Sequence, residues 1–222
     1  MQKRIYLDWN ASSPLSKNAF LAMKSTFANF ANPSSSHCEG RAAKKAIEKA
    51  RDKIAELIGL NTRFNIIFTS GATESAAMVL HNKILNCAPI EHECVKVWSC
   101  SNLVVNENGT VNIDDPSNST LQAANSETGI IQHIPNGIYF TDAAQAFGKI
   151  FTDFSKFDFQ FSSISSHKIG GPKGIGALIV KDINNLNSFI KGGGQEFGKR
   201  SGTENLMNIQ GFAKSIEDRI FE

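Results

Sequence analysis

The 222-residue sequence lacks any long apolar run, and no window approaches the roughly 20 apolar residues of a membrane-spanning helix. Only the short apolar segment Ile5-Tyr6-Leu7 follows Met1-Gln2-Lys3-Arg4, and no long apolar stretch comes after it, so we expect no signal peptide. An excess of one charge is also lacking, because 23 basic residues stand against 21 acidic ones. This balance gives no electrostatic footprint for nucleic acid or for an anionic membrane surface, and we expect neither as a partner.

Cysteine is scarce and carries no recognisable pattern. The four cysteines are Cys38, Cys87, Cys94 and Cys100, and they form neither a CxxC pair nor a zinc-binding spacing. We therefore expect free thiols in a reducing cytoplasm rather than a disulfide framework, and no metal site.

A hydrophobic content of 41% is enough to build a core, and we expect one domain over residues 1–222. A helix capped by Ser13 or Ser16 is predicted through Phe27. A second runs over 41–58, with apolar residues recurring at three and four, and ends at Gly59. Predicted strands cover 65–69, 95–98, 137–141, 159–164 and 175–180, and Asn108-Gly109 predicts a hairpin-like turn. The alternation indicates an α/β fold whose mainly parallel sheet is flanked by helices.

Polar signals follow three of these strands, where ligands bind in open α/β sheets. The first is Ser70-Gly71-Ala72-Thr73, which opens a predicted helix. Its backbone N–H groups and the helix N-terminus would suit an anion such as phosphate, and the Thr73 hydroxyl could assist. A plain turn explains the same residues without a ligand.

The second and third signals are Asp142 and Lys168. A carboxylate at the end of a strand can hold the N–H of a pyridinium ring, although Asp142 could instead cap a helix. Lys168 could form a Schiff base with an aldehyde cofactor, with Ser165 and His167 on its phosphate, although most lysines simply lie on the surface. Together the three signals supply the parts that pyridoxal phosphate (PLP) chemistry needs.

Further motifs extend the series in order along the chain. They are 32–35 (NPSS), 68–74 (FTSGATE), 90–92 (IEH), 127–132 (ETGIIQ), 142–146 (DAAQA), 166–168 (SHK), 170–176 (GGPKGIG), 192–196 (GGGQE) and 200–205 (RSGTEN). With these motifs the chain resembles the cysteine desulfurases, in the class V branch of the fold-type I PLP enzymes, from Tyr6 to Ile209.

The resemblance implies a role for each matching residue. Lys168 would carry the cofactor, Asp142 would hold its ring nitrogen, and His92 would stack on the ring and move protons. The remaining implied cofactor contacts are Ala72, Thr73, Ser126, Gln145, Ser165 and His167, with Thr203 reaching the phosphate of the other subunit in a homodimer. The family's reaction converts L-cysteine to alanine and an enzyme-bound persulfide, which feeds iron–sulfur cluster assembly or tRNA thiolation through a sulfur-acceptor scaffold protein.

The sequence departs from the family in several places. Ser126 stands where an asparagine normally contacts the cofactor, so this contact is lost or made through water. Ala76 and Ala77 stand where the family often has asparagine. The chain is also short of helical sequence between His92 and Asn125 and between Gln132 and Tyr139.

The largest departure is that the chain ends at Glu222. The family's sulfur-attacking cysteine and its carboxylate-binding arginine lie downstream of the Thr203 motif, the arginine in a small C-terminal domain. None of the four cysteines takes the catalytic place, and Cys94, although near His92, is expected to be an ordinary small buried residue. The alternatives are another class V enzyme, such as a selenocysteine lyase or an aminotransferase, and a PLP-binding remnant without turnover.

Overall fold

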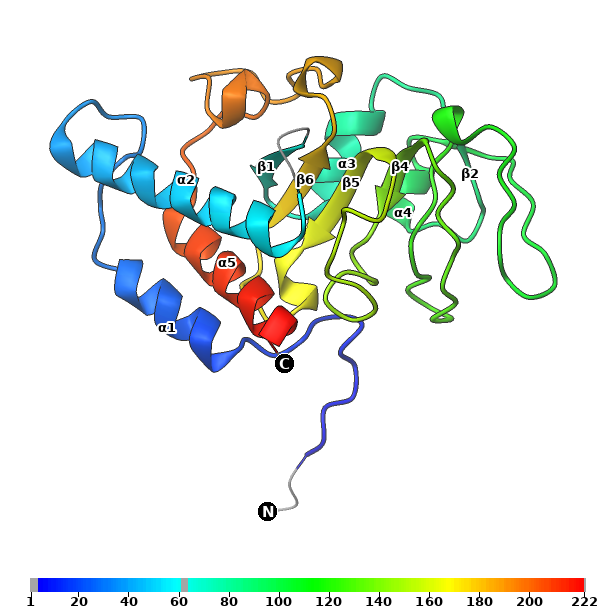
Figure 1. Cartoon of the computed structure of the whole chain (residues 1–222), viewed down its shortest axis with the longest axis horizontal. Helices are drawn as coiled ribbons and strands as arrows, with labels where there is room; N and C mark the ends of the chain where they lie inside the picture. The colour runs from blue at the N-terminus through cyan, green and yellow to red at the C-terminus, as the bar shows by residue number, and fades with distance from the viewer. Residues whose placement is uncertain (1–3, 61–63, 222) are drawn as a thin grey trace.

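A four-stranded sheet forms the centre of the computed structural model, which describes residues 4–60 and 64–221 (Figure 1). The strands are β1 (Asn65–Thr69), β4 (Ile138–Asp142), β5 (Phe159–Ser165) and β6 (Gly176–Val180), in the order β1-β6-β5-β4. The predicted α/β class is confirmed, but the sheet is mixed, because β6 lies antiparallel between β1 and β5. A short glycine-rich turn joins β5 to β6, and a parallel crossover needs a dozen or more residues.

Successive side chains of β1 and β6 pack into different layers, as the twofold period of a strand requires. Ile66 and Phe68 of β1 join one hydrophobic core, while Ile67 between them joins the other. The first core also takes in α2 (Cys38–Leu57) and α5 (Leu206–Phe221), and the second takes in α3 (Ala72–Leu80). The sheet is therefore covered on both faces.

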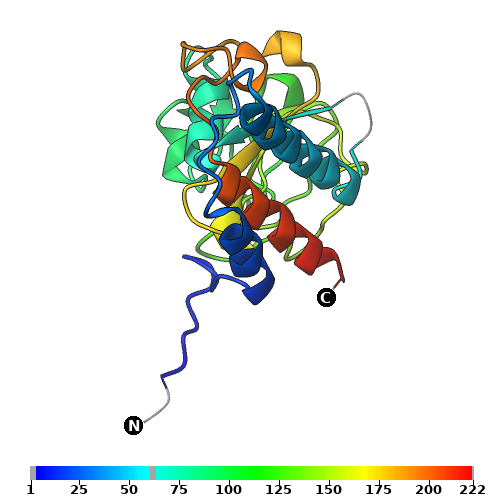
Figure 2. The same ribbon diagram turned by 90° about the vertical axis from the view of Figure 1, so that its left-hand side faces the viewer.

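The helices on the first face lie side by side in both views (Figures 1 and 2). α1 (Lys17–Thr26) begins at Ser16, whose Oγ accepts a hydrogen bond from the Ala19 N–H at 3.0 Å, so the predicted capping by Ser16 is confirmed. α2 ends as predicted, with Gly59 at a φ of +71° that favours glycine. These helices cover the face of the sheet opposite to the one covered by α3.

The prediction of a strand over 95–98 is wrong. Residues Glu93–Lys96 form the short helix α4. The His92 side chain accepts a hydrogen bond from the Cys94 N–H, and Lys96 pairs with Glu93 one turn away. These two local contacts favour a helical turn over the strand suggested by alternating Val95, Lys96 and Val97.

The segment between α4 and β4 is mostly irregular. It contains β3 (Cys100–Ser101), which pairs in parallel with β2 (Asn86–Cys87), and a 3-10 turn, η1 (Pro116–Asn118). The predicted hairpin is reduced to a single antiparallel bridge between Val105 and Val111 around Gly109, whose φ is +75°. The remaining 3-10 turns are η2 (Ser166–Lys168), η3 (Ile183–Asn185) and η4 (Glu196–Gly198).

The N-terminal segment extends away from the body of the molecule in both views (Figures 1 and 2). Ile5 and Leu7 on it are 77% and 84% exposed. Further along, Asn10 to Ser13 return to the sheet and contact the turn that carries Lys168. Within the described residues, no helix is long and apolar enough to cross a membrane.

Candidate functional site

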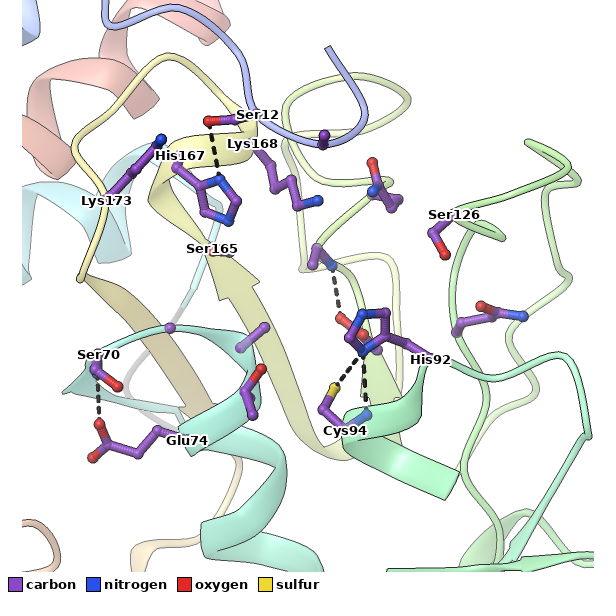
Figure 3. A pocket seen from close by; sticks show the side chains of 18 of the residues that line it. Ser12, Ser70, Glu74, His92, Cys94, Ser126, Ser165, His167, Lys168 and Lys173 are labelled. Carbon is purple, nitrogen blue, oxygen red and sulfur yellow. Dashed lines mark hydrogen bonds between the residues drawn. The ribbon is translucent and has the colours of Figure 1, made fainter. Parts of the chain in front are cut away.

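A cavity of about 710 Å³ lies at the carboxyl ends of β1, β4 and β5 (Figure 3). These three strands run in the same direction, because β6 is antiparallel to both β1 and β5 while β4 is parallel to β5. Their carboxyl ends therefore meet at one edge of the sheet. This brings together the three polar signals that the sequence places after separate strands.

Nearly all predicted site residues line this cavity. They are Ala72, Thr73, His92, Ser126, Asp142, Gln145, Ser165, His167 and Lys168. Thr203 does not line it, and lies exposed in the loop that precedes α5. The residues that sequence reasoning missed include Ser12, Cys94, Gln122 and Lys173.

The loop from Ser70 to Thr73 leads from β1 into α3 and faces the cavity. A Cβ added at Gly71 would meet no atom within 4 Å, so open space lies in front of this backbone. The Ser70 N–H is held by Oε2 of Glu74 at 2.7 Å, and Arg200 donates to Oε1 of the same carboxylate at 2.8 Å. Burial opposes ionisation of Glu74, but the hydrogen bonds from Arg200 and Ser70 prevail and lower its pKa. The loop is thus fixed before any ligand arrives.

Asp142, at the end of β4, is 9% exposed. Its Oδ1 accepts hydrogen bonds from the Ala144 N–H at 2.9 Å and from the Ser163 hydroxyl at 3.0 Å. The residues after Asp142 form turns at 144–146 and 148–150 and no helix, so the alternative of a helix cap at Asp142 is wrong. Within the described chain no hydrogen bond reaches Oδ2, which leaves one carboxylate oxygen for a ligand.

Lys168 follows β5 in η2 and is half-buried. Its Nζ donates to the backbone carbonyl of Asn10, which also accepts a hydrogen bond from Gln145 Nε2 at 3.0 Å. Burial lowers the Lys168 pKa, although the carboxylates of Asp142 and Asp8 oppose this effect. A larger share of neutral amine results, which is the form that attacks an aldehyde.

His167 and Lys173 flank the lysine on the side of the Ser70 loop (Figure 3). Burial, together with the charges of Lys168 and Lys173, lowers the His167 pKa, so that its ring is neutral at pH 7. Its Nδ1 lies 3.2 Å from the Ser12 hydroxyl. These residues give the cavity wall a cation and several polar groups at the end where the Ser70 loop lies.

His92 approaches the cavity from the opposite wall (Figure 3). Both hydrogen-bond contacts of its side chain among residues 4–60 and 64–221 are to Cys94, through the backbone N–H at 3.2 Å and Sγ at 3.0 Å. Burial, reinforced by the charges of Asp142 and Glu91, raises the pKa of the Cys94 thiol to about 12. The sequence spacing of two residues from His92 was the one available signal for this contact.

Ser126 lines the cavity beside a well-ordered turn. Asn125 Oδ1 accepts hydrogen bonds from the N–H groups of Glu127 and Thr128, each at 2.8 Å. Its side-chain amide donates to the Ile90 carbonyl, which also receives Gln122 Nε2. Ser126 is therefore a shorter cavity-facing side chain than the expected asparagine, on a turn whose hydrogen bonds are intact.

The four cysteines are free thiols in the structure. Cys38 and Cys100 are exposed, Cys87 and Cys94 are buried, and only Cys94 lines the cavity. No group of three or more His, Cys, Asp or Glu among the described residues is arranged to hold a metal ion.

Comparisons with known proteins agree with this geometry. The family Aminotransferase class-V matches residues 5–96 and 107–218. Cysteine desulfurase IscS of Dictyoglomus turgidum is 36% identical over the whole chain, and that of Rickettsia felis is 36% identical over 96% of it. The chain spans 65% and 61% of the length of these relatives.

Solved structures show the same fold. The NifS-like protein from Rickettsia africae matches with a TM-score of 0.89 and 30% identity, covering 99% of this chain and 69% of that one. A structure described as SspA in complex with cysteine matches with a TM-score of 0.84 and 32% identity, covering 96% of this chain and 72% of that one.

Proposed function

Because the chain belongs to the class-V aminotransferase family, we propose that its cavity binds PLP and that the residues around it serve a cysteine desulfurase reaction. The single observation that carries the proposal is the meeting of Lys168, Asp142 and the Ser70–Thr73 loop around one cavity. Its volume of about 710 Å³ is of the size that holds a small organic cofactor.

The residues present fit the parts of PLP. Open space in front of Gly71 leaves room for a phosphate against the backbone N–H groups of the loop. The free Oδ2 of Asp142 suits a pyridinium N–H, and the Lys168 amine suits the aldehyde. The proposed further contacts are Ala72, Thr73, Ser165 and His167 toward the phosphate, and Gln145 and Ser126 toward the ring, with His92 against its face.

When bound, PLP supplies an aldehyde and an electron-withdrawing ring that stabilises negative charge on the substrate. In the proposed reaction Lys168 would hold the aldehyde of the cofactor, and a basic side chain of the cavity would take the α-proton of L-cysteine. Asp142 would hold the ring nitrogen in its protonated form, because a carboxylate favours the charged form of that ring. Lys168 and His92 are the two side chains placed to move the proton.

The substrate, the product and the partners are proposals by analogy. The structure described as SspA in complex with cysteine supports an amino-acid substrate for the same fold. A homodimer would use the exposed Thr203 to complete the partner's phosphate site, and a sulfur-acceptor scaffold protein would receive the persulfide sulfur. A cytoplasmic location is proposed on the free thiols and the analogy with these relatives.

A second candidate, PLP binding without sulfur transfer, is favoured by the placement of the cysteines. Sulfur transfer needs a thiolate positioned at the substrate sulfur. Cys94 alone among the four lines the cavity, and its raised pKa keeps it a thiol. The described lining also contains two lysines and no arginine that could bind a carboxylate in the two-pronged manner.

Two measurements on the 222-residue chain separate the candidates. Titration with PLP should produce the near-visible absorbance of bound cofactor, and a protein that stays colourless would contradict both. Alanine and sulfide release from L-cysteine, compared with free PLP, then tests turnover. We expect release no faster than with free PLP, whereas fast release that vanishes on replacing one cysteine by serine would identify a nucleophile among the four.

A further inference from the structure

The ring of His92 is held by a single neighbouring residue. The Cys94 backbone N–H lies 3.2 Å from Nδ1 in hydrogen-bond geometry. A backbone amide can only donate, so Nδ1 must be the acceptor and carries no proton. In a neutral imidazole the proton then lies on Nε2, on the edge of the ring turned away from α4 and toward the cavity (Figure 3).

The Cys94 side chain reinforces this arrangement. Its Sγ lies 3.0 Å from the same Nδ1, and the residue is 7% exposed. Burial and the nearby carboxylates of Asp142 and Glu91 raise the thiol pKa to about 12, so the sulfur keeps its proton at neutral pH. A protonated thiol can donate to an unprotonated nitrogen at this distance, and the Thr73 side chain is a second hydrogen-bond partner of the same thiol.

We propose that Cys94 is a positioning residue: its thiol and its backbone N–H together hold His92 as the neutral Nε2–H tautomer. The ring then presents a hydrogen-bond donor, not a proton acceptor, to the cavity. Within the proposed function, on which this consequence rests, Lys168 rather than His92 is left to take the substrate's α-proton. The same contacts assign Cys94 a role other than sulfur nucleophile, because its proton is engaged with His92.

The direct test is nitrogen NMR of the histidine rings in 15N-labelled protein without added PLP. The ring of His92 is assigned by its loss in His92→Asn. Wild-type protein should show an unprotonated Nδ1 and a protonated Nε2 for this ring. Cys94→Ala should shift the tautomer ratio toward Nδ1–H by about fivefold, the effect of losing one ordinary hydrogen bond. Cys94→Ser should restore the wild-type ratio, because its hydroxyl can donate in the same place.

Cys100→Ala is the matched control, because Cys100 is an exposed thiol outside the cavity. It should leave the His92 signals unchanged. A proton on Nδ1 in the wild type, or an unchanged ratio in Cys94→Ala, would overturn the proposal. If Cys94→Ala does not fold, the wild-type spectrum and Cys94→Ser still decide it. Failure of every variant to take up PLP would instead contradict the proposed function and leave the tautomer result intact.

Discussion

Two sets of opposite charges lie beside the same sheet, one against the edge strand β1 and the other at the carboxyl ends of β4 and β5, and their surroundings differ. Arg51 and Glu196 form a bidentate pair, with both nitrogen–oxygen distances at 2.8 Å. The Phe68 N–H also donates to Glu196, and Arg51 also donates to the Ile66 carbonyl. The centroids of two phenylalanine rings lie within 5.0 Å of the guanidinium carbon. Within the described residues, no salt bridge joins Lys168 to Asp142, and each bonds to neutral groups instead.

The Arg51–Glu196 network therefore stabilises the fold, whereas Lys168 and Asp142 are available for chemistry. The buried charges of Arg51 and Glu196 face each other directly, Arg51 also pairs with the half-exposed Glu48, and the network ties the loop before α5 to α2 and β1. Burial opposes the charge on Arg51, but Glu196 prevails and raises its pKa. The cavity groups keep an unbonded carboxylate oxygen and an amine with a lowered pKa, which leaves both open to a ligand.

The largest effect should come from Lys168→Ala. Removing the amine removes covalent attachment of PLP completely, while the melting temperature should change little, because Nζ contacts only a backbone carbonyl. Absorbance during PLP titration and thermal unfolding measure the two effects. Lys173→Ala is the control, since it removes the other lysine of the cavity wall and should only weaken the affinity. Equal loss of attachment in both variants would show that the two lysines are not distinguished.

Arg51→Met should have the opposite effect to Lys168→Ala: it should lower the stability of the fold and leave the attachment of PLP unchanged. It leaves Glu196 buried and unpaired, which costs about 3–5 kcal/mol of unfolding free energy. Lys53→Met on the same helix is the control, because it breaks an exposed pair with Glu56 at 3.1 Å and should cost less than about 1 kcal/mol. Urea unfolding measures both, and equal costs would remove the distinction between the two networks.

Asp142→Asn should retain PLP but slow α-proton exchange of a bound amino acid by about 100-fold, since a neutral amide does not stabilise a charged ring. Ser163→Ala is the control. It removes one hydrogen bond to Oδ1 and leaves the carboxylate, so its effect should be clearly smaller. Proton NMR in deuterated water follows the exchange, and an unchanged rate in Asp142→Asn would exclude this role.

Glu91 lies beside the cavity, and no salt bridge joins it to a basic group in the part of the chain that the structure describes. Burial raises its pKa to about 8, with the Asp142 charge adding to the shift, and no described partner reaches Oε2. The folded chain thus holds a proton that the unfolded chain releases above its ordinary pKa of 4.5. Stability should therefore fall as the pH rises between these two values, by up to about 1.4 kcal/mol per pH unit.

Glu91→Gln should flatten that slope between pH 5 and 8, as measured by urea unfolding at several pH values. The exposed Glu107→Gln serves as the control and should keep the wild-type slope. A slope that is equally steep in Glu91→Gln would place the proton on another group.

Local patterns predicted much of this fold and of the candidate site. Apolar periodicity located α2, and strand ends located Asp142 and Lys168, because each signal lies within a few adjacent residues. The direction of β6 could not be read in this way, since it depends on pairing with β1, which is distant in the chain. The helix at Glu93–Lys96 was missed because side-chain contacts of His92 and Lys96 outweigh a four-residue alternation.

The contacts of several residues around the cavity could not be predicted from the sequence. Ser12 reaches His167 across 155 positions of the chain, and Asn10 reaches Lys168 across 158. Such contacts exist only once the N-terminal segment has folded back onto the sheet. Cys94 was interpreted as an ordinary buried residue, and its burial is confirmed, but its contact with His92 gives it a definite partner.

The most direct test of the central claim is borohydride reduction of the PLP-treated chain, followed by mass spectrometry of its peptides. We expect a single reduced PLP adduct on the peptide that contains Lys168, present in Lys173→Ala and absent from Lys168→Ala. An adduct spread over several surface lysines, or one that persists in Lys168→Ala, would contradict it.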